Sequence, residues 1–90
     1  MKKAKLFMGE LCERLELPEE AAAGAARVTV TGGRRALVEN HRGLLEYGAE
    51  QIRVSTGRGQ LVLRGSGLTL AAMSGRDLLI RGKLQSAEWE

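Results

Sequence analysis

Cysteine and histidine, on which many catalytic and metal sites depend, each occur once in this chain of 90 residues. Cys12 has no second cysteine to pair with, which excludes a disulfide within the chain and fits a reducing, cytosolic setting. Cys12 and His41 fall in different predicted segments, a helix and a turn, and nothing indicates the third group that would orient a Cys–His nucleophile pair. We therefore expect no enzymatic activity, no catalytic residues, no metal and no cofactor.

Aromatic residues and long apolar runs are also scarce. Phe7, Tyr47 and Trp89 make up the 3% of aromatic residues, so the core must be built from leucine, valine, isoleucine and alanine. No apolar stretch approaches the roughly 20 residues that a membrane-spanning helix needs, so no transmembrane segment is expected. Charged residues interrupt the segment that follows the N-terminal lysines, so we also expect no signal peptide.

The composition that remains is that of one small folded domain, residues 1–90. Hydrophobic residues make up 43% and charged residues 28%, proportions typical of a folded chain. A chain this short buries only about 60–65% of the surface that its unfolded form exposes, so its core is thin and favours a partner or self-association. The net charge of +3 is a mild excess, and without interleaved aromatic residues no nucleic-acid binding is expected.

Residues 2–16 have the apolar periodicity of an amphipathic helix, with six side chains on one face: Leu6, Phe7, Met8, Leu11, Cys12 and Leu15. Pro18 ends this pattern, because the residue before a proline is biased away from helical geometry. We predict a helix within residues 1–17 and a linker over 18–26. Three interpretations of the helix stay open: packing on its own sheet, docking on a partner, or lying on a membrane surface.

From Arg27 onward, apolar and polar residues alternate with the two-residue period of β-strands. Glycine-containing turn signals separate the runs, and connections this short join antiparallel neighbours. We expect about seven strands, at residues 27–31, 35–40, 43–47, 51–56, 60–65, 67–73 and 77–84, the last running on toward Trp89. The predicted fold is α+β and mainly β: an N-terminal helix followed by a β-module over residues 27–90, arranged as a meander or small β-roll.

Two segments of the β-module are similar in sequence, Leu61–Gly65 and Leu78–Gly82, at an offset of 17 residues. One interpretation is a solenoid-like repeat, although a solenoid needs three or more copies. The other is a pair of similar hairpins in one sheet.

Two groups of polar residues are candidate partner-binding sites. Asn40, His41, Arg42 and Gly43 form the densest polar cluster of the β region, either a recognition loop or a solvated turn. Arg53, Arg64 and Arg81 lie on the outward faces of three predicted strands. If those strands are neighbours, the three arginines form a basic stripe for an acidic partner; alternatively, they only keep the wet face of the sheet soluble.

The run Val38–Tyr47, which reads Val-Glu-Asn-His-Arg-Gly-Leu-Leu-Glu-Tyr, resembles the central signature of the YabP/YqfC family of sporulation proteins. Similar segments follow in the family's order at Gln51–Thr56, Leu63–Leu68 and Leu79–Gly82. The likeness covers roughly residues 1–84, and the lysine-rich N-terminus and the Leu17–Pro18 step are similar to the YqfC branch. The alanine- and glycine-rich stretch Glu20–Ala26 departs from the family's pattern.

The resemblance implies a small protein made by endospore-forming bacteria, acting in the mother-cell cytoplasm in spore envelope formation with a membrane-protein partner. The resemblance implies no enzymatic activity, no cofactor and no catalytic residue. We therefore predict a non-enzymatic assembly or scaffolding protein that acts through protein–protein contacts. Its expected partners are further copies of itself, as a homo-oligomer, and/or a sporulation membrane protein that brings it to the membrane. The alternative is a basic β-module that binds an anionic ligand, a membrane surface or nucleic acid.

Overall fold

The structure is a computed structural model that describes residues 5–7, 14–16 and 25–90. These residues form eight strands: β1 (Lys5–Phe7), β2 (Arg14–Glu16), β3 (Arg27–Thr31), β4 (Arg35–Glu39), β5 (His41–Tyr47), β6 (Gln51–Thr56), β7 (Gly59–Met73) and β8 (Asp77–Trp89). None of the described residues is helical, so the predicted α+β class is wrong and the described part of the chain is all-β.

The helix predicted within residues 1–17 is contradicted wherever the structure describes that segment. β1 pairs with residues 86–88 of β8, and β2 pairs with residues 29–31 of β3. Backbone pairing with a sheet overrides local helix propensity, which differs among ordinary residues by at most about 0.7 kcal/mol each. The rest of the predicted helix, and nearly all of the linker predicted at 18–26, lie outside the described residues.

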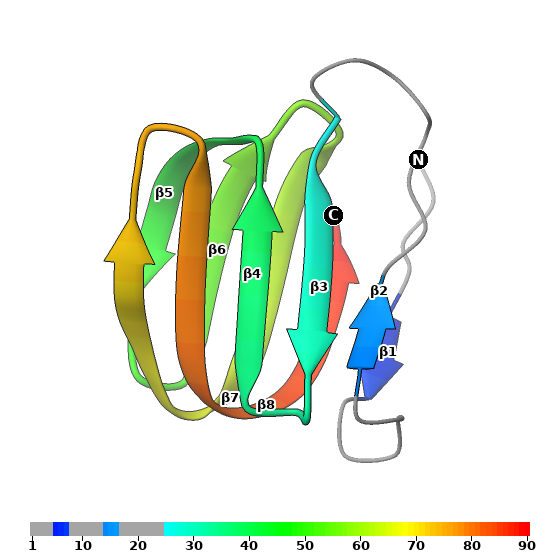
Figure 1. The fold of residues 1–90 in the computed structure, drawn as a ribbon, viewed down its shortest axis with the longest axis vertical. Coiled ribbons are helices and arrows are strands. Elements are labelled where there is room, and N and C mark those ends of the chain that lie inside the picture. Colours follow the sequence, from blue (N-terminus) through cyan, green and yellow to red (C-terminus); the bar gives the residue numbers. More distant parts are fainter. Residues whose placement is uncertain (1–4, 8–13, 17–24) are drawn as a thin grey trace.

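All eight strands belong to one antiparallel sheet with the order β2-β3-β4-β8-β7-β6-β5, and β1 pairs with the far end of β8. Because β4 lies beside β8, the strands are not in the consecutive order of a meander. Figure 1 shows that the sheet folds over on itself. We call β3, β4, the start of β8 and the end of β7 the front layer. The back layer consists of β5, β6, the start of β7 and the end of β8.

The bend between the layers depends on glycine. Residues 60–65 and 67–73 were predicted as two strands joined by a turn at Gly65–Gly67, but they are one long strand, β7. A Cβ atom at Gly65 would collide with the carbonyl oxygen of Lys83 in the neighbouring strand. Gly82 has a φ of +135°. Its backbone N–H donates a hydrogen bond of 3.1 Å to the carbonyl oxygen of Arg34, in the turn between β3 and β4. Glycine serves here for close backbone approach rather than for a hairpin.

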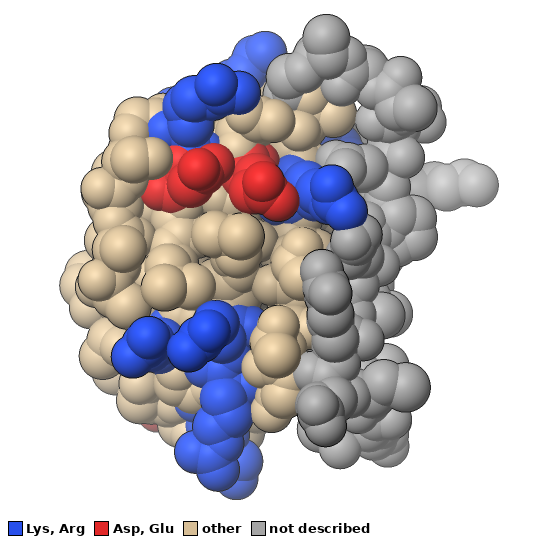
Figure 2. Space-filling model, viewed as in Figure 1, with Lys and Arg blue, Asp and Glu red and all other residues tan. Residues whose placement is uncertain are grey.

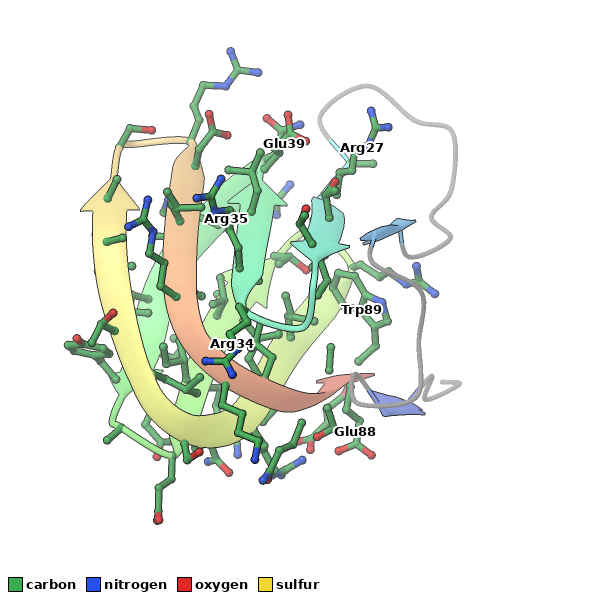
Figure 3. All side chains as sticks on the ribbon, turned by 60° about the horizontal axis from the view of Figure 1, so that its bottom comes forward. Arg27, Arg34, Arg35, Glu39, Glu88 and Trp89 are labelled. Atoms are coloured by element: carbon green, nitrogen blue, oxygen red, sulfur yellow. The ribbon has the colours of Figure 1, made fainter. Side chains whose placement is uncertain are left out.

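The core lies between the two layers. Strand alternation predicts it well: in β6, Ile52 and Val54 are fully buried, while Gln51, Arg53 and Ser55 are half-buried. Leucine, valine, isoleucine and alanine make up most of the core cluster, as predicted, and Trp89 completes it at 3% exposed. Figure 3 shows Trp89 and its neighbour Glu88 pointing to opposite sides of the end of β8. The predicted strands at 27–31 and 51–56 are confirmed with their bounds.

Candidate functional site

Asn40 forms the corner between β4 and β5 and ties three segments together. Its backbone is left-handed, with a φ of 61°, a conformation that asparagine tolerates better than most residues. Its side-chain amide donates a hydrogen bond of 3.0 Å to the carbonyl oxygen of Ala25. The amide oxygen accepts one of 3.0 Å from the guanidinium of Arg76, in the β7–β8 turn. The predicted turn at residues 40–43 is therefore confined to Asn40, since β5 begins at His41.

His41 connects β5 to the β7–β8 turn through two hydrogen bonds, and it is only 7% exposed. Its Nε2 lies 2.9 Å from the carbonyl oxygen of Ser74, and because a carbonyl only accepts, Nε2 carries the proton. The backbone N–H of His41 donates to the carbonyl oxygen of Arg76 at 3.0 Å. Nδ1 is buried without a partner among the described residues. Both hydrogen bonds join the layers through main-chain oxygens, a structural role.

Arg42 and Gly43 complete this predicted cluster without joining His41 in one surface. Arg42 is exposed, and its guanidinium lies against Gly57 in the β6–β7 turn, with Nη2 3.2 Å from the position of a Cβ atom there. Gly43 has a φ of +147° beside an irregularity in the pairing of β5 with β6. The cluster is therefore divided: His41 is buried and has a structural role, whereas Arg42 is exposed.

Arg53 and Arg64 lie on the outer side of the back layer, within a network of ion pairs. Arg53 Nη1 is 3.1 Å from a carboxylate oxygen of Glu90, and Arg53 Nε is 3.4 Å from one of Glu46. The hydrogen bond to Glu90 raises the pKa of the Arg53 guanidinium above its usual value, against the opposing effect of burial. Arg64 Nη1 lies 3.0 Å from Glu88. Both arginines are neutralised by acids of the same chain.

Under this network lies Val62, which is fully buried although it does not belong to the core cluster. Val62 stands opposite Arg53 in β6 and opposite Glu88 in β8. The stems of long charged side chains cover apolar surface while their charged ends stay in water. The network therefore shields an apolar side chain on the back layer.

Arg81 is separated from the other two arginines of the predicted stripe. It lies in the front layer, opposite Thr69 of β7 and Arg35 of β4, and it is exposed. The bend of the sheet places it on the other side of the molecule from Arg53 and Arg64, so the three do not form one basic stripe.

Sequence reasoning missed a side of the molecule where both layers end, which we call the open side. It consists of β5, the last strand of the back layer, and the end of β7, which pairs only with β8 (Figure 1). All three exposed large apolar side chains of the described residues lie on these two strands: Leu45 at 52%, Tyr47 at 54% and Met73 at 54%. Tyr47 links them, because its hydroxyl oxygen accepts a hydrogen bond of 3.1 Å from the backbone N–H of Leu70.

One feature of the sequence indicates the open side: Leu44 and Leu45 are adjacent, which breaks the alternation of apolar and polar residues in β5. An irregularity in the pairing between Leu44 and Glu46 leaves Leu44 against the core and turns Leu45 outward. A bulge of this kind changes which face a side chain reaches.

Comparison with known proteins decides the family. The YabP family model matches residues 22–90. The chain belongs to the YabP family. It is 28% identical over 74 residues to an uncharacterized protein, YqfC of Bacillus subtilis, a match that covers 82% of this chain and 80% of that protein. No solved structure matches.

Two kinds of feature are absent from the described residues of this YabP-family chain. No helix there is long and apolar enough to cross a membrane. In the same residues, no group of three or more histidine, cysteine or acidic side chains is placed to hold a metal ion.

Proposed function

We propose that this YabP-family protein is a non-enzymatic assembly module of endospore formation, and that its open side binds a partner protein. The observation that carries the proposal is the gathering of Leu45, Tyr47 and Met73 on the two strands where the layers end. Large apolar side chains that are grouped and exposed mark interaction surfaces more often than scattered ones do. Family membership, together with the sporulation role that the resemblance implies, supports the cellular setting.

The backbone of the open side favours one specific partner over indiscriminate pairing. The N–H of Leu70 on the β7 edge is already bonded to Tyr47, and that of Leu68 donates to the carbonyl oxygen of Ala49 at 2.8 Å. β5 carries two pairing irregularities, and bulges on an edge strand discourage edge-to-edge aggregation. An incoming segment would instead pack its own apolar side chains on Leu45 and Met73.

The partner that fits this setting is a sporulation membrane protein, met in the cytoplasm of the mother cell. Such a contact would bring the chain to the membrane through the partner. The proposal assigns no chemistry to His41, because its buried hydrogen bonds hold β5 to the β7–β8 turn.

Spore formation in the organism that carries this gene tests the proposal. Deletion is expected to lower the yield of heat-resistant spores, and the wild-type gene to restore it. Leu45→Asp with Met73→Asp should fail to restore the yield at normal protein level, because both charges fall on the open side. The matched control is Ser66→Asp with Gln85→Asp, two exposed positions away from it. An unchanged spore yield on deletion contradicts the sporulation role; full rescue by the open-side variant contradicts the site.

A second candidate function, binding of an anionic ligand or membrane surface, rests on two exposed basic residues near the bend, Arg34 and Lys83. Figure 2 shows basic side chains gathered at the lower end of the front layer. Sedimentation with vesicles of anionic lipid, at low and high salt, tests it. Binding that disappears with Arg34→Glu and Lys83→Glu would favour this function, and no binding at low salt removes it.

A further inference from the structure

The outer face of the front layer carries three rows of side chains, which the register of β4 and β8 sets side by side. The rows are Arg35 opposite Arg81, Leu37 opposite Leu79, and Glu39 opposite Asp77. Their sequence neighbours Ala36, Val38, Leu78 and Ile80 are fully buried in the core, so these six residues lie on the opposite, outer side. We call them the front face. In Figure 2 the acids lie above a band of uncharged surface and basic residues lie below it, with further basic residues above and beside the acids.

Both charged rows place like charges directly opposite each other. Two arginines face each other at one end of the β4–β8 pair, and two acids face each other at the other end. Like charges in directly opposed positions of neighbouring strands destabilise a sheet. None of these four side chains forms an ion pair with another residue in the part of the chain that the structure describes. Arg27 of β3 stands opposite Glu39 and offsets part of the repulsion between the acids, so the arginine pair is the less favourable row in a single chain.

The rows are evenly spaced about the leucines. Leu37 is two residues from Arg35 and two from Glu39, and Leu79 is likewise midway between Asp77 and Arg81. Rotation by a half-turn about the leucine row therefore exchanges the basic row with the acidic row. A second, identical face laid on the first in this way has its acids over the first chain's arginines.

We propose that the front face binds the front face of a second copy of this chain. The twofold axis lies in the plane of contact, runs across the strands and passes along the Leu37–Leu79 row. Arg35 then meets the partner's Glu39, and Arg81 meets the partner's Asp77. By symmetry each contact occurs twice, as an isologous interface requires. The leucines pack at the centre, where Thr29, Thr31, Arg35, Leu37 and Leu79 line a shallow hollow open to the outside.

Charge selects a second copy over an anionic partner. A membrane of anionic lipid or a nucleic acid laid on this face would gain contacts with Arg35 and Arg81 but would be repelled by Glu39 and Asp77. The face needs a partner with the reverse order of charges at the same spacing, and its own copy has that order. The inference does not rest on the function proposed above, because it uses a different surface from the open side.

The size of the face sets the expected affinity. With the flanking strands β3 and β7 included, four strands about 4.8 Å apart and five residues at about 3.4 Å each give a contact of roughly 320 Å² per chain. This area is smaller than that of stable interfaces, so we expect a weak dimer that forms only at high micromolar to millimolar concentrations. Salt should weaken the dimer, since its outer rows attract through charge. A dimer in the opposite orientation would place arginines over arginines, and salt would raise its affinity by screening their repulsion.

Charge reversal tests the interface, with solution mass measured by sedimentation equilibrium. Arg35→Glu with Arg81→Glu makes the front face wholly acidic, and Glu39→Arg with Asp77→Arg makes it wholly basic. Each double variant alone is expected to raise the dissociation constant on the order of 100-fold, because like charges then oppose each other across the axis. A 1:1 mixture of the two should associate, and the variant with all four changes should again form a dimer by itself.

Controls separate this interface from misfolding and from the open side. Arg42→Glu and Glu50→Arg reverse one exposed charge each, away from the front face, and are expected to leave the dimer unchanged. Leu45→Asp with Met73→Asp should also leave it unchanged, whatever its effect on spore yield. The inference is overturned if the wild-type chain stays monomeric at millimolar concentration, if either double variant dimerises as tightly as the wild type, or if the two folded variants fail to associate when mixed.

Discussion

Gly82 of β8 and Gly67 of β7 touch at the bend of the sheet: a Cβ atom on Gly82 would lie 2.6 Å from the carbonyl oxygen of Gly67. β7 and β8 run side by side from one layer to the other, and they can do so only because neither residue at this contact has a side chain. The bend in turn creates both surfaces to which functions are assigned here. It sets the front face outward and brings the ends of the two layers together at the open side.

Replacing Gly82 by alanine is therefore expected to destabilise the fold. The φ of +135° is unfavourable for any residue with a side chain, and the added methyl group meets backbone atoms that cannot rotate away. We expect Gly82→Ala to lower the free energy of unfolding by at least about 2 kcal/mol in urea denaturation. Gly75→Ala is the control, because a Cβ atom there meets nothing within 4 Å. Equal stability of the two variants would show that the bend does not depend on close backbone approach.

His41 is expected to contribute to stability through its hydrogen bond to Ser74. His41→Ala removes a buried ring and leaves the carbonyl oxygen of Ser74 without its donor, at a cost of about 2–4 kcal/mol in the free energy of unfolding. His41→Gln should recover part of this loss, since its side-chain amide can donate from a position near that of Nε2. Arg42→Ala, next in sequence but exposed, should change stability by less than about 1 kcal/mol. A stable, folded His41→Ala protein that fails in spore formation would instead support a recognition or catalytic role.

The network on the back layer should act as a cover for Val62. Arg53→Ala uncovers this side chain, whereas Arg53→Met removes the charge but keeps a long apolar stem over it. Thermal unfolding should therefore rank wild type and Arg53→Met close together, with Arg53→Ala the least stable of the three. If Arg53→Met loses as much as Arg53→Ala, the charges and not the stem carry the stabilisation, and the loss should then shrink at high salt.

Sequence patterns predicted most of the individual strands but not how they are assembled. The alternation of apolar and polar residues predicted β3 and β6 with the correct first and last residues, because each strand has one buried face and one outer face. It failed at Gly65–Gly67, where glycine indicates a turn and a bend equally well. The repeated segments Leu61–Gly65 and Leu78–Gly82 have a physical explanation in the structure: each is the part of a long strand that leads into the bend, where its glycine lies against neighbouring backbone.

The candidate surfaces depended on contacts that no local pattern reveals. Asn40 and His41 were recognised as a motif, yet their partners at residues 25, 74 and 76 lie far away in sequence. The front face was missed because it requires β4 to lie beside β8, and strands so distant along the chain are not paired by short-turn rules. The N-terminal helix was wrong where the structure describes that segment, because periodicity alone does not report pairing with β3 and β8.

The central claim is that the front face is a preformed surface that binds a second copy of this chain, and the mass of the wild-type protein in solution tests it most directly. Light scattering over a concentration series should show a rise from one chain of 9.8 kDa toward two chains and no further. A mass of two chains that falls back toward one as salt is added is the predicted result. A mass that stays at one chain up to millimolar protein, or one that grows without limit through the sheet edges, would contradict it.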